Sequence, residues 1–193
     1  MRFTPYRTAR GIRLDLLQGA VALQELPRTV RLFQVSLAPM SHTPRFHRLA
    51  VSDLRRETAD AVPLAFAIPD ELADDYHFAP GQCLTLCTMM DGEEVRRSYS
   101  ICSGPDDGEI RIAVKRIDGG AFSSWAADEL KAGDELDVMT PTGRFGVAPA
   151  AGEERVHVGF AAGSGITPIL SIIKSMLERE PNSRFFLFYG NRA

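Results

Sequence analysis

The spacing of apolar residues changes near residue 150 of this 193-residue chain, and that change limits the possible folds more than any other feature. Upstream, short apolar runs alternate with turn residues, a pattern typical of a small antiparallel barrel. Downstream, a continuous apolar run leads into a glycine-rich turn and a helical pattern, which is typical of a strand-helix-strand unit in a parallel sheet. The sequence therefore predicts an α+β chain made of two different parts.

The upstream part is predicted to form the barrel. Its apolar runs are separated by spacers such as Ala79-Pro80-Gly81 and Ala132-Gly133-Asp134, which contain the residue types that supply turn dihedrals. Phe122–Leu130 contains better helix formers, so we expect it to cover one end of the barrel. The predicted strands are Phe46–Val51, Val62–Ile68, Gln82–Thr88, Val95–Ile101, Ile110–Ile117 and Glu135–Met139.

The downstream part is predicted to contain one strand-helix-strand unit. Arg155–Ala161 is suited to a strand buried on both faces, and residues 169–177 follow helical spacing. We expect Thr167 to cap this helix and Pro168 to occupy its first position. Arg184–Tyr189 predicts a second buried strand. Because a doubly wound domain contains several such units, we expect this part to be incomplete.

The N-terminal segment shows no sustained apolar period of either strand or helix type. We expect it to be a poorly ordered extension, and Met40 is an alternative start of translation. The predicted organisation is therefore an extension at 1–43, a barrel domain at 44–150 and the incomplete α/β domain at 151–193.

Charge and composition exclude several classes of protein. A net charge of -3 and a pI near 5.8 give no electrostatic basis for binding nucleic acid. No stretch approaches the roughly 20 apolar residues of a membrane span, and no signal-peptide core is present, so we expect a cytoplasmic protein without a membrane partner. The cysteines and histidines share no ligand spacing, which predicts reduced thiols and no metal site.

Three motifs carry possible chemistry, and the first is the turn Gly163-Ser164-Gly165-Ile166-Thr167-Pro168 between a strand and a helix. Glycines let the backbone approach a ligand closely, and free N–H groups at a helix start attract phosphate. The third glycine of the usual dinucleotide fingerprint is absent, so a tight turn without a ligand remains the alternative.

The second motif is Arg97-Ser98-Tyr99-Ser100 on a predicted strand. Arg97 and Tyr99 should share one face, while Ser98 and Ser100 share the other. A forked cation suits a phosphate, and a phenol ring suits a flat ligand that can also hydrogen-bond. Taken alone, an arginine and a tyrosine on an exposed face are more often ordinary surface residues.

The third motif follows Val114-Lys115 and reads Gly119-Gly120-Ala121-Phe122-Ser123. A glycine pair and a hydroxyl at a helix start suit a pyrophosphate, although Ser123 could equally be an ordinary N-cap.

The order of these motifs resembles the ferredoxin–NADP reductase superfamily over about residues 44–193. Within that superfamily, residues 96–103 and 189–192 resemble a narrower group, the reductase subunits that serve phenylacetate degradation. The ordered motifs are Arg97-Ser98-Tyr99-Ser100, Gly120-Ala121-Phe122-Ser123, Pro141-Thr142-Gly143-Arg144-Phe145 and the turn that begins at Gly163.

The resemblance implies a Greek-key FAD-binding barrel followed by a partial NAD(P)-binding domain. Arg97 would meet the flavin pyrophosphate, Tyr99 would pack on the isoalloxazine, and Ser100 would hydrogen-bond near its reactive N5 edge, which makes Tyr99 and Ser100 the implied catalytic residues. Cys83 departs from the pattern, because relatives often carry an aromatic residue there. The other implied cofactor-binding residues are Ser98, Val114, Lys115, Gly120, Phe122, Ser123, Gly163, Gly165 and Thr167.

The implied function is electron transfer from NADPH or NADH through FAD to an iron–sulfur acceptor that serves an oxygenase. A 2Fe–2S cluster is expected only in a further C-terminal domain, because the plant-type cysteine spacing is absent here. The expected protein partner is an oxygenase or a ferredoxin. Two alternatives are a non-catalytic fragment that binds FAD or docks a partner, and a reductase that releases reduced flavin.

Overall fold

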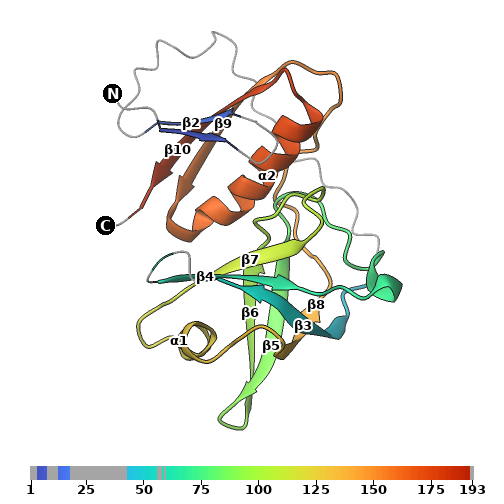
Figure 1. Ribbon diagram of the computed structural model, residues 1–193, viewed down its shortest axis with the longest axis vertical. Coiled ribbons are helices and arrows are strands. Elements are labelled where there is room, and N and C mark those ends of the chain that lie inside the picture. The colour runs from blue at the N-terminus through green and yellow to red at the C-terminus, as the bar shows by residue number, and fades with distance from the viewer. Residues whose placement is uncertain (1–3, 8–12, 18–42, 56–57, 59, 192–193) are drawn as a thin grey trace.

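The computed structural model describes residues 4–7, 13–17, 43–55, 58 and 60–191, which form two sheets (Figure 1). One sheet is antiparallel and six-stranded, and the other has four strands with a helix against it. The predicted fold class, a barrel-type β part followed by an α/β part, is therefore confirmed.

The antiparallel sheet is a Greek-key barrel. Its strand order is β6-β5-β8-β3-β4-β7, so strands distant in sequence lie side by side. The two outer strands approach each other where Ile101 bridges Ile112 and the Cys102 N–H donates to the Arg111 carbonyl at 2.8 Å. The strands are β3 (Phe46–Leu54), β4 (Ala61–Phe66), β5 (Cys83–Met90), β6 (Glu93–Ser100), β7 (Ile110–Lys115) and β8 (Glu135–Met139).

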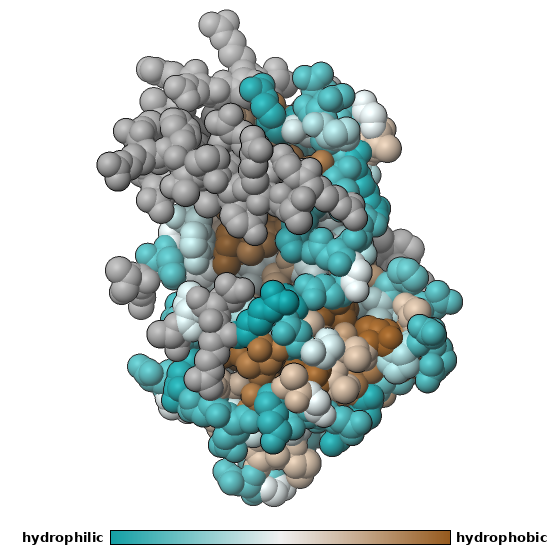
Figure 2. Space-filling view, viewed as in Figure 1, coloured by the Kyte–Doolittle hydropathy of each residue, from teal (hydrophilic) through white to brown (hydrophobic). Residues whose placement is uncertain are grey.

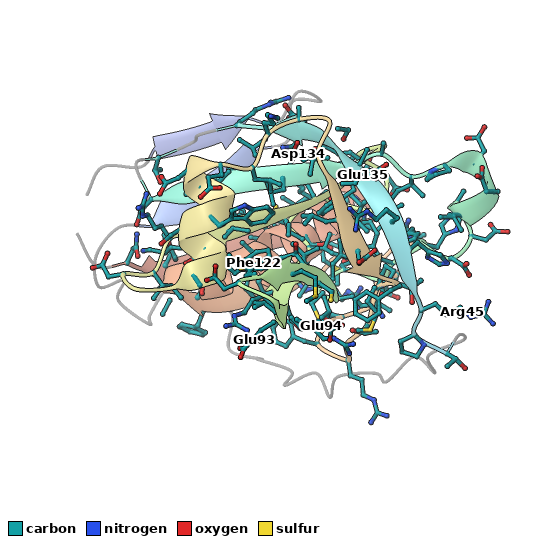
Figure 3. The ribbon with its side chains drawn as sticks, turned by 90° about the horizontal axis from the view of Figure 1, so that it is seen from below. Arg45, Glu93, Glu94, Phe122, Asp134 and Glu135 are labelled. Atoms are coloured by element: carbon teal, nitrogen blue, oxygen red, sulfur yellow. The ribbon has the colours of Figure 1, made fainter. Side chains whose placement is uncertain are left out.

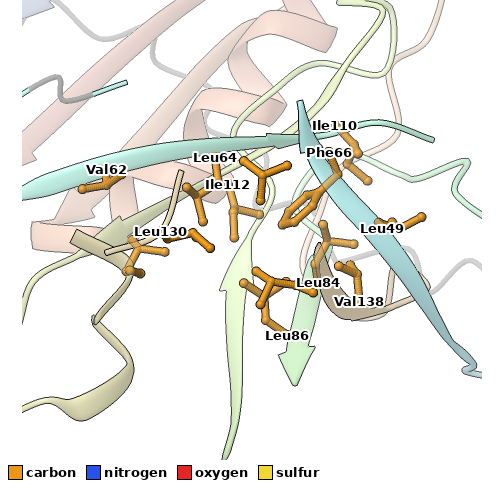
Figure 4. Packing of buried hydrophobic residues seen from close by; sticks show 14 of the residues in the cluster. Leu49, Val62, Leu64, Phe66, Leu84, Leu86, Ile110, Ile112, Leu130 and Val138 are labelled. Atoms are coloured by element: carbon orange, nitrogen blue, oxygen red, sulfur yellow. The ribbon is translucent and has the colours of Figure 1, made fainter. Parts of the chain in front are cut away.

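Alternating apolar residues fill the barrel and explain why these segments form strands. Within these strands the side chains buried in the core recur at every second position. Examples that are fully buried are Leu64, Leu84, Leu86, Ile112 and Val138 (Figure 4). The short helix α1 (Ala121–Asp128) covers one end of the barrel, as predicted, and its Phe122 ring packs in the same core. The one-turn helix η2 (Asp70–Leu72) lies in the loop before β5.

The α/β part has the predicted order of strand, helix and strand. It consists of β9 (Val156–Ala162), the short turn η3 (Gly163–Gly165), α2 (Ile166–Arg179) and β10 (Arg184–Gly190). The two strands are parallel and in register from Arg184 opposite Val156 onward. The apolar stripe of α2 packs on them through Ile169, Ile172, Ile173, Met176 and Leu177.

Two further strands come from the N-terminal segment, where the sequence predicted no element. β1 (Thr4–Arg7) and β2 (Arg13–Leu17) form an antiparallel hairpin, and β2 lies parallel to β10, which gives the order β1-β2-β10-β9. The other residues of the expected extension 1–43, apart from residue 43, lie outside the described residues. A strand that pairs with a partner almost the whole chain away leaves little local signal, because its pattern depends on that distant partner.

The visible face of the barrel in Figure 2 carries hydrophobic side chains surrounded by hydrophilic ones. Among the described residues, the large apolar side chains that stay exposed are Met89, Ile117, Phe145, Phe160 and Tyr189. No helix in the described part of the chain is long and apolar enough to cross a membrane.

Candidate functional site

Strand β6 presents Arg97 and Tyr99 on one face, as the sequence predicts. They stand opposite Leu86 and Leu84 of β5, whose side chains fill the barrel, while Ser98 on the other face is hydrogen-bonded to Thr85 at 2.8 Å. Because β6 is an outer strand of the sheet, this face extends beyond the packed core towards solvent.

The Arg97 guanidinium is exposed and has no acidic partner within the described part of the chain. Its one hydrogen bond there goes to the backbone carbonyl of Arg96, at 2.7 Å. Neighbouring arginines differ, since Arg96 pairs with Glu94 at 2.8 Å and Arg111 pairs with both Asp53 and Glu109. A guanidinium without a carboxylate remains available to an anionic ligand.

The Tyr99 ring is half-buried and is supported by aromatic rings of α1. Its centroid lies 5.8 Å from that of Phe122, which in turn lies 5.7 Å from Trp125. Figure 3 shows Phe122 between α1 and the strands. Burial raises the pKa of the Tyr99 phenol, against the smaller opposite effect of Arg97, so the hydroxyl stays protonated as a donor. The sequence analysis did not identify Trp125, because one aromatic residue in a short helix gives no distinctive pattern.

The turn before α1 keeps its glycines for steric reasons. A Cβ on Gly120 would lie 2.6 Å from the Ser123 hydroxyl and 3.0 Å from the Ile117 carbonyl, and Gly119 has a φ of +74°. Gly120 is the N-cap and has no side chain to bond the first amides of α1, which lack intrahelical partners. These N–H groups and the open turn are suited to a phosphate.

Four of the predicted residues near this turn already make contacts within the fold. Ser123 is buried, and its hydroxyl donates to the Gly120 carbonyl at 3.2 Å and accepts from the Ile117 N–H at 3.1 Å. Val114 and Phe122 are buried in the barrel core, so their side chains support the site from behind. Lys115 forms an ion pair with Asp60 at 3.3 Å and remains partly exposed. Ligand contacts from Val114 and Ser123 would therefore come from the backbone.

Ser100 lies at the end of β6 beside a second glycine-containing segment. It stands opposite Cys83, which bridges to Thr142 on the loop after β8. A Cβ on Gly81 would collide with the Phe145 carbonyl, and Gly81 has a φ of +92°, so both loops can pack closely only with glycine there. These loops form one border of the site around Ser100.

The glycine turn of the α/β part differs from the expected helix start. Gly163 adopts a φ of +51°, and α2 begins at Ile166 with Gly165 as its N-cap. Thr167 therefore lies inside the first turn, where its hydroxyl donates to the Ser164 carbonyl at 2.9 Å, and the prediction of Thr167 as cap and Pro168 as first residue was wrong. The helix starts earlier because the η3 turn continues directly into it. Gly165 remains exposed at its N-terminus.

The three cysteines are all free thiols, as predicted. Within the described residues no cluster of histidine, cysteine or acidic side chains could hold a metal ion. His157 is buried.

Cys102 gives a testable consequence of burial next to the site. Burial raises the pKa of its thiol to about 11, although Lys174 and Arg111 act in the opposite direction. At pH 8 about one thiol in a thousand is then a thiolate, so we expect iodoacetamide to alkylate Cys102 roughly 100-fold more slowly than the same cysteine in a short free peptide. Peptide mass spectrometry measures both rates, and equal rates would contradict the burial.

The side chains and amides of this region fit FAD. A pyrophosphate carries two charges, which suit the exposed Arg97 guanidinium, without a carboxylate partner among the described residues, and the uncapped start of α1. The Tyr99 ring, which packs against Phe122, suits a flat heterocycle. When bound, FAD supplies redox chemistry that the protein side chains lack.

Comparison with protein families identifies both parts of the chain. Residues 48–146 match the family described as oxidoreductase FAD-binding domain, and residues 160–193 match the oxidoreductase NAD-binding domain. The first match covers the barrel and the second begins within β9.

Two curated relatives are components of larger oxygenation systems. The chain is 50% identical over 148 residues to a subunit of the 1,2-phenylacetyl-CoA epoxidase of Escherichia coli (strain K12), covering 77% of this chain and 42% of that protein. It is 40% identical over 153 residues to the ferredoxin reductase component of 3-ketosteroid-9-alpha-monooxygenase of Rhodococcus rhodochrous, covering 78% of this chain and 42% of that protein. The chain thus spans less than half the length of these relatives.

Solved structures show the same fold. Phthalate dioxygenase reductase, described as a modular structure for electron transfer from pyridine nucleotides to [2Fe-2S], matches with a TM-score of 0.62 and 29% identity, over 77% of this chain and 44% of that one. The cytochrome P450 reductase GcoB of Amycolatopsis matches with a TM-score of 0.63 and 29% identity, over 79% of this chain and 45% of that one.

Proposed function

The chain belongs to the oxidoreductase FAD-binding domain family, and from this premise we propose that it binds FAD along β6 and passes electrons from NADPH or NADH to an iron–sulfur protein that serves an oxygenase. The observation that carries the proposal is the exposed Arg97 guanidinium, without an acidic partner among the described residues, beside the supported Tyr99 ring on one strand face. FAD offers both an anionic pyrophosphate and a flat ring.

The site residues divide this task among them. Arg97 and the first amides of α1 neutralise the pyrophosphate, and the backbone at Val114, Lys115, Gly120 and Ser123 lines the same side. Tyr99 packs against the flavin ring and holds its plane. Ser100 would donate a hydrogen bond towards the N5 edge of the flavin, whose redox chemistry the cofactor would supply.

The α/β part forms the side of the FAD site that would face the nicotinamide. Gly163 and Gly165 leave open space, since a Cβ on either would meet nothing within 4 Å, and Thr167 lies one turn into α2. We assign the FAD-binding domain to 44–150 and the first strand-helix-strand of an NAD(P)-binding domain to 151–193. The hairpin of β1 and β2 extends the second sheet from the segment 1–43.

The likeness to a component of the phenylacetyl-CoA epoxidase supports a role for the proposed oxygenase in phenylacetate degradation. Relatives in steroid and phthalate oxygenase systems support the same role as a reductase component. The electron acceptor would be a ferredoxin or a 2Fe–2S domain, since the described residues offer no ligand cluster of their own. We propose the cytoplasm as the compartment in which the protein meets these electron carriers.

Reconstitution tests the flavin part. The chain is incubated with FAD, FMN or riboflavin and passed through gel filtration, and we expect retention of FAD with quenched fluorescence and loss of riboflavin, because only FAD has both pyrophosphate and adenosine for the α1 turn. A colourless protein after incubation with FAD would refute the proposal. Retention also opposes the alternative of a reductase that releases its flavin.

Stopped-flow mixing separates the enzyme from a non-catalytic FAD-binding or docking fragment. The fragment alternative is motivated by the match to only 42% of the relative's length. Prompt bleaching of bound FAD by NADPH or NADH supports the reductase, and a persistent oxidised spectrum supports the fragment.

A further inference from the structure

The loop between β6 and β7 makes a set of polar contacts with α2 that no sequence motif predicted. The Ser171 hydroxyl donates to the Ser103 carbonyl at 2.7 Å, and both residues are fully buried. Lys174 pairs with Asp107 at 2.6 Å. At the last residue of α2, Arg179 pairs with Asp106 at 3.0 Å. We call these three contacts the α2 clasp.

The barrel side of the α2 clasp has a rigid base. The Ser103 hydroxyl accepts from the Arg111 N–H at 3.0 Å, and the adjacent Cys102 N–H donates to the Arg111 carbonyl at 2.8 Å. Arg111 itself is held on β7 by Asp53 and Glu109, each at 2.7 Å. The loop is therefore an extension of the barrel wall rather than an independent segment.

Asp107 shapes the tip of the loop so that it reaches the helix. Its carboxylate accepts from the Gly104 N–H at 3.0 Å, and its own N–H donates to the Gly104 carbonyl at 3.1 Å. A Cβ on Gly104 would lie 3.2 Å from the Lys174 Cβ, so the backbone and the helix are almost in van der Waals contact. This approach leaves no room for a larger residue unless the helix moves.

The helix side of the α2 clasp is equally fixed. Ser171, Lys174 and Arg179 all contact the loop between β6 and β7, whereas the apolar residues of α2 pack on β9 and β10. The turn Gly163–Gly165 leads directly into the same helix. A rigid helix transmits any displacement at Lys174 or Arg179 to this turn.

We propose that the α2 clasp positions the turn Gly163–Gly165 relative to Ser100 and Tyr99, so that Asp106, Asp107, Lys174 and Arg179 are positioning residues for the approach of nicotinamide to flavin. The effect on nicotinamide and flavin rests on the proposed function, whereas the placement of α2 by the loop rests only on the three contacts. Two of the three contacts are partly exposed ion pairs, so each is weak and sensitive to salt. The placement of α2 therefore responds to ionic strength.

The test uses charge reversal and swap at the outer pair, whose Asp106 carboxylate bonds only Arg179 within the described residues. Asp106→Arg, Arg179→Asp and the double swap are compared with Lys131→Asp, a reversal of an exposed barrel lysine on another loop. Amide hydrogen exchange of residues 104–108 is measured without flavin. We expect each single reversal to raise exchange there by about fivefold, and the swap to restore it.

Visible circular dichroism of the FAD-loaded chain gives the second readout. Both single reversals should change the flavin band, about 1 M salt should change the wild-type band in the same direction, and the swap should return it. Unchanged exchange and an unchanged band in both reversals would overturn the α2 clasp. Failure of the wild type to bind FAD would remove the proposed function, while the exchange comparison would still decide whether the loop holds α2.

Discussion

Replacing Arg97 with alanine should weaken FAD binding by about 10- to 100-fold, because a charge-assisted pair with phosphate contributes roughly 1.5 to 3 kcal/mol. Arg97 is the cation of β6 without an acidic partner among the described residues, so its removal breaks no ion pair of the protein there. Fluorescence titration of the reconstituted chain measures the FAD dissociation constant. The effect should fall as ionic strength rises, since salt screens the lost charge.

Arg96→Ala is the matched control for this experiment. Arg96 is the preceding residue of β6, so it points to the opposite face, where its guanidinium pairs with Glu94 at 2.8 Å and lies 5.1 Å from the centre of the Phe46 ring. We expect Arg96→Ala to change FAD affinity by no more than about twofold. Equal losses in the two variants would indicate a general effect of positive charge, and would remove Arg97 from the pyrophosphate site.

The part of the site that sequence could predict depends on local periodicity. Alternation along the predicted strand Val95–Ile101 placed Arg97 and Tyr99 on one face, and the structure agrees because β6 pairs continuously with β5. The short apolar runs that contain Leu84, Leu86 and Ile112, separated by turn residues, likewise predicted the barrel. These features could be predicted because the two-residue period of a strand can be recognised in a single sequence.

The features that sequence could not predict depend on distant partners. The hydroxyl of Ser123 is consumed by its own turn, and the side chain of Val114 is committed to the core, although both motifs suggested ligand contacts. The α2 clasp joins Asp106 and Arg179, which are 73 residues apart, and neither residue has a pattern that indicates the other. Such contacts become visible only once the strand order is known.

The largest effect on stability should come from Glu180, to which no sequence motif assigns a role. Glu180 is fully buried at the C-terminal end of α2 and accepts hydrogen bonds from the Ala150 N–H at 2.8 Å and from Ser183 at 2.8 Å. Arg155 forms a two-pronged pair with it, and His157 lies 3.0 Å away. The Glu180 carboxylate at the end of α2 therefore contacts the segment at Ala150, strand β9 through His157, and the turn before β10 through Ser183.

The protonation of Glu180 sets a pH limit on the α/β part. Burial alone would raise its pKa, but the hydrogen bonds from Arg155, Ala150, His157 and Ser183 outweigh burial and lower it to about 2. A carboxyl whose pKa is lower in the folded state stabilises the fold at pH values above its unfolded pKa of about 4.3. That contribution is lost as the pH falls from about 4.3 towards 2, so we expect the wild type to lose stability across this window.

Glu180→Gln should lower the free energy of unfolding of the α/β part by about 3 to 5 kcal/mol, because it removes the buried negative charge that Arg155, His157, Ser183 and the Ala150 N–H all contact. Circular dichroism at 222 nm follows α2, while fluorescence of Trp125, the one tryptophan of the chain, follows the barrel. In urea the helix signal should be lost well before the tryptophan signal changes. Glu154→Gln, the same substitution at an exposed site, should leave both midpoints within about 0.5 kcal/mol of the wild type. If the two variants behaved alike, Glu180 would not be the centre that holds the second sheet to its helix.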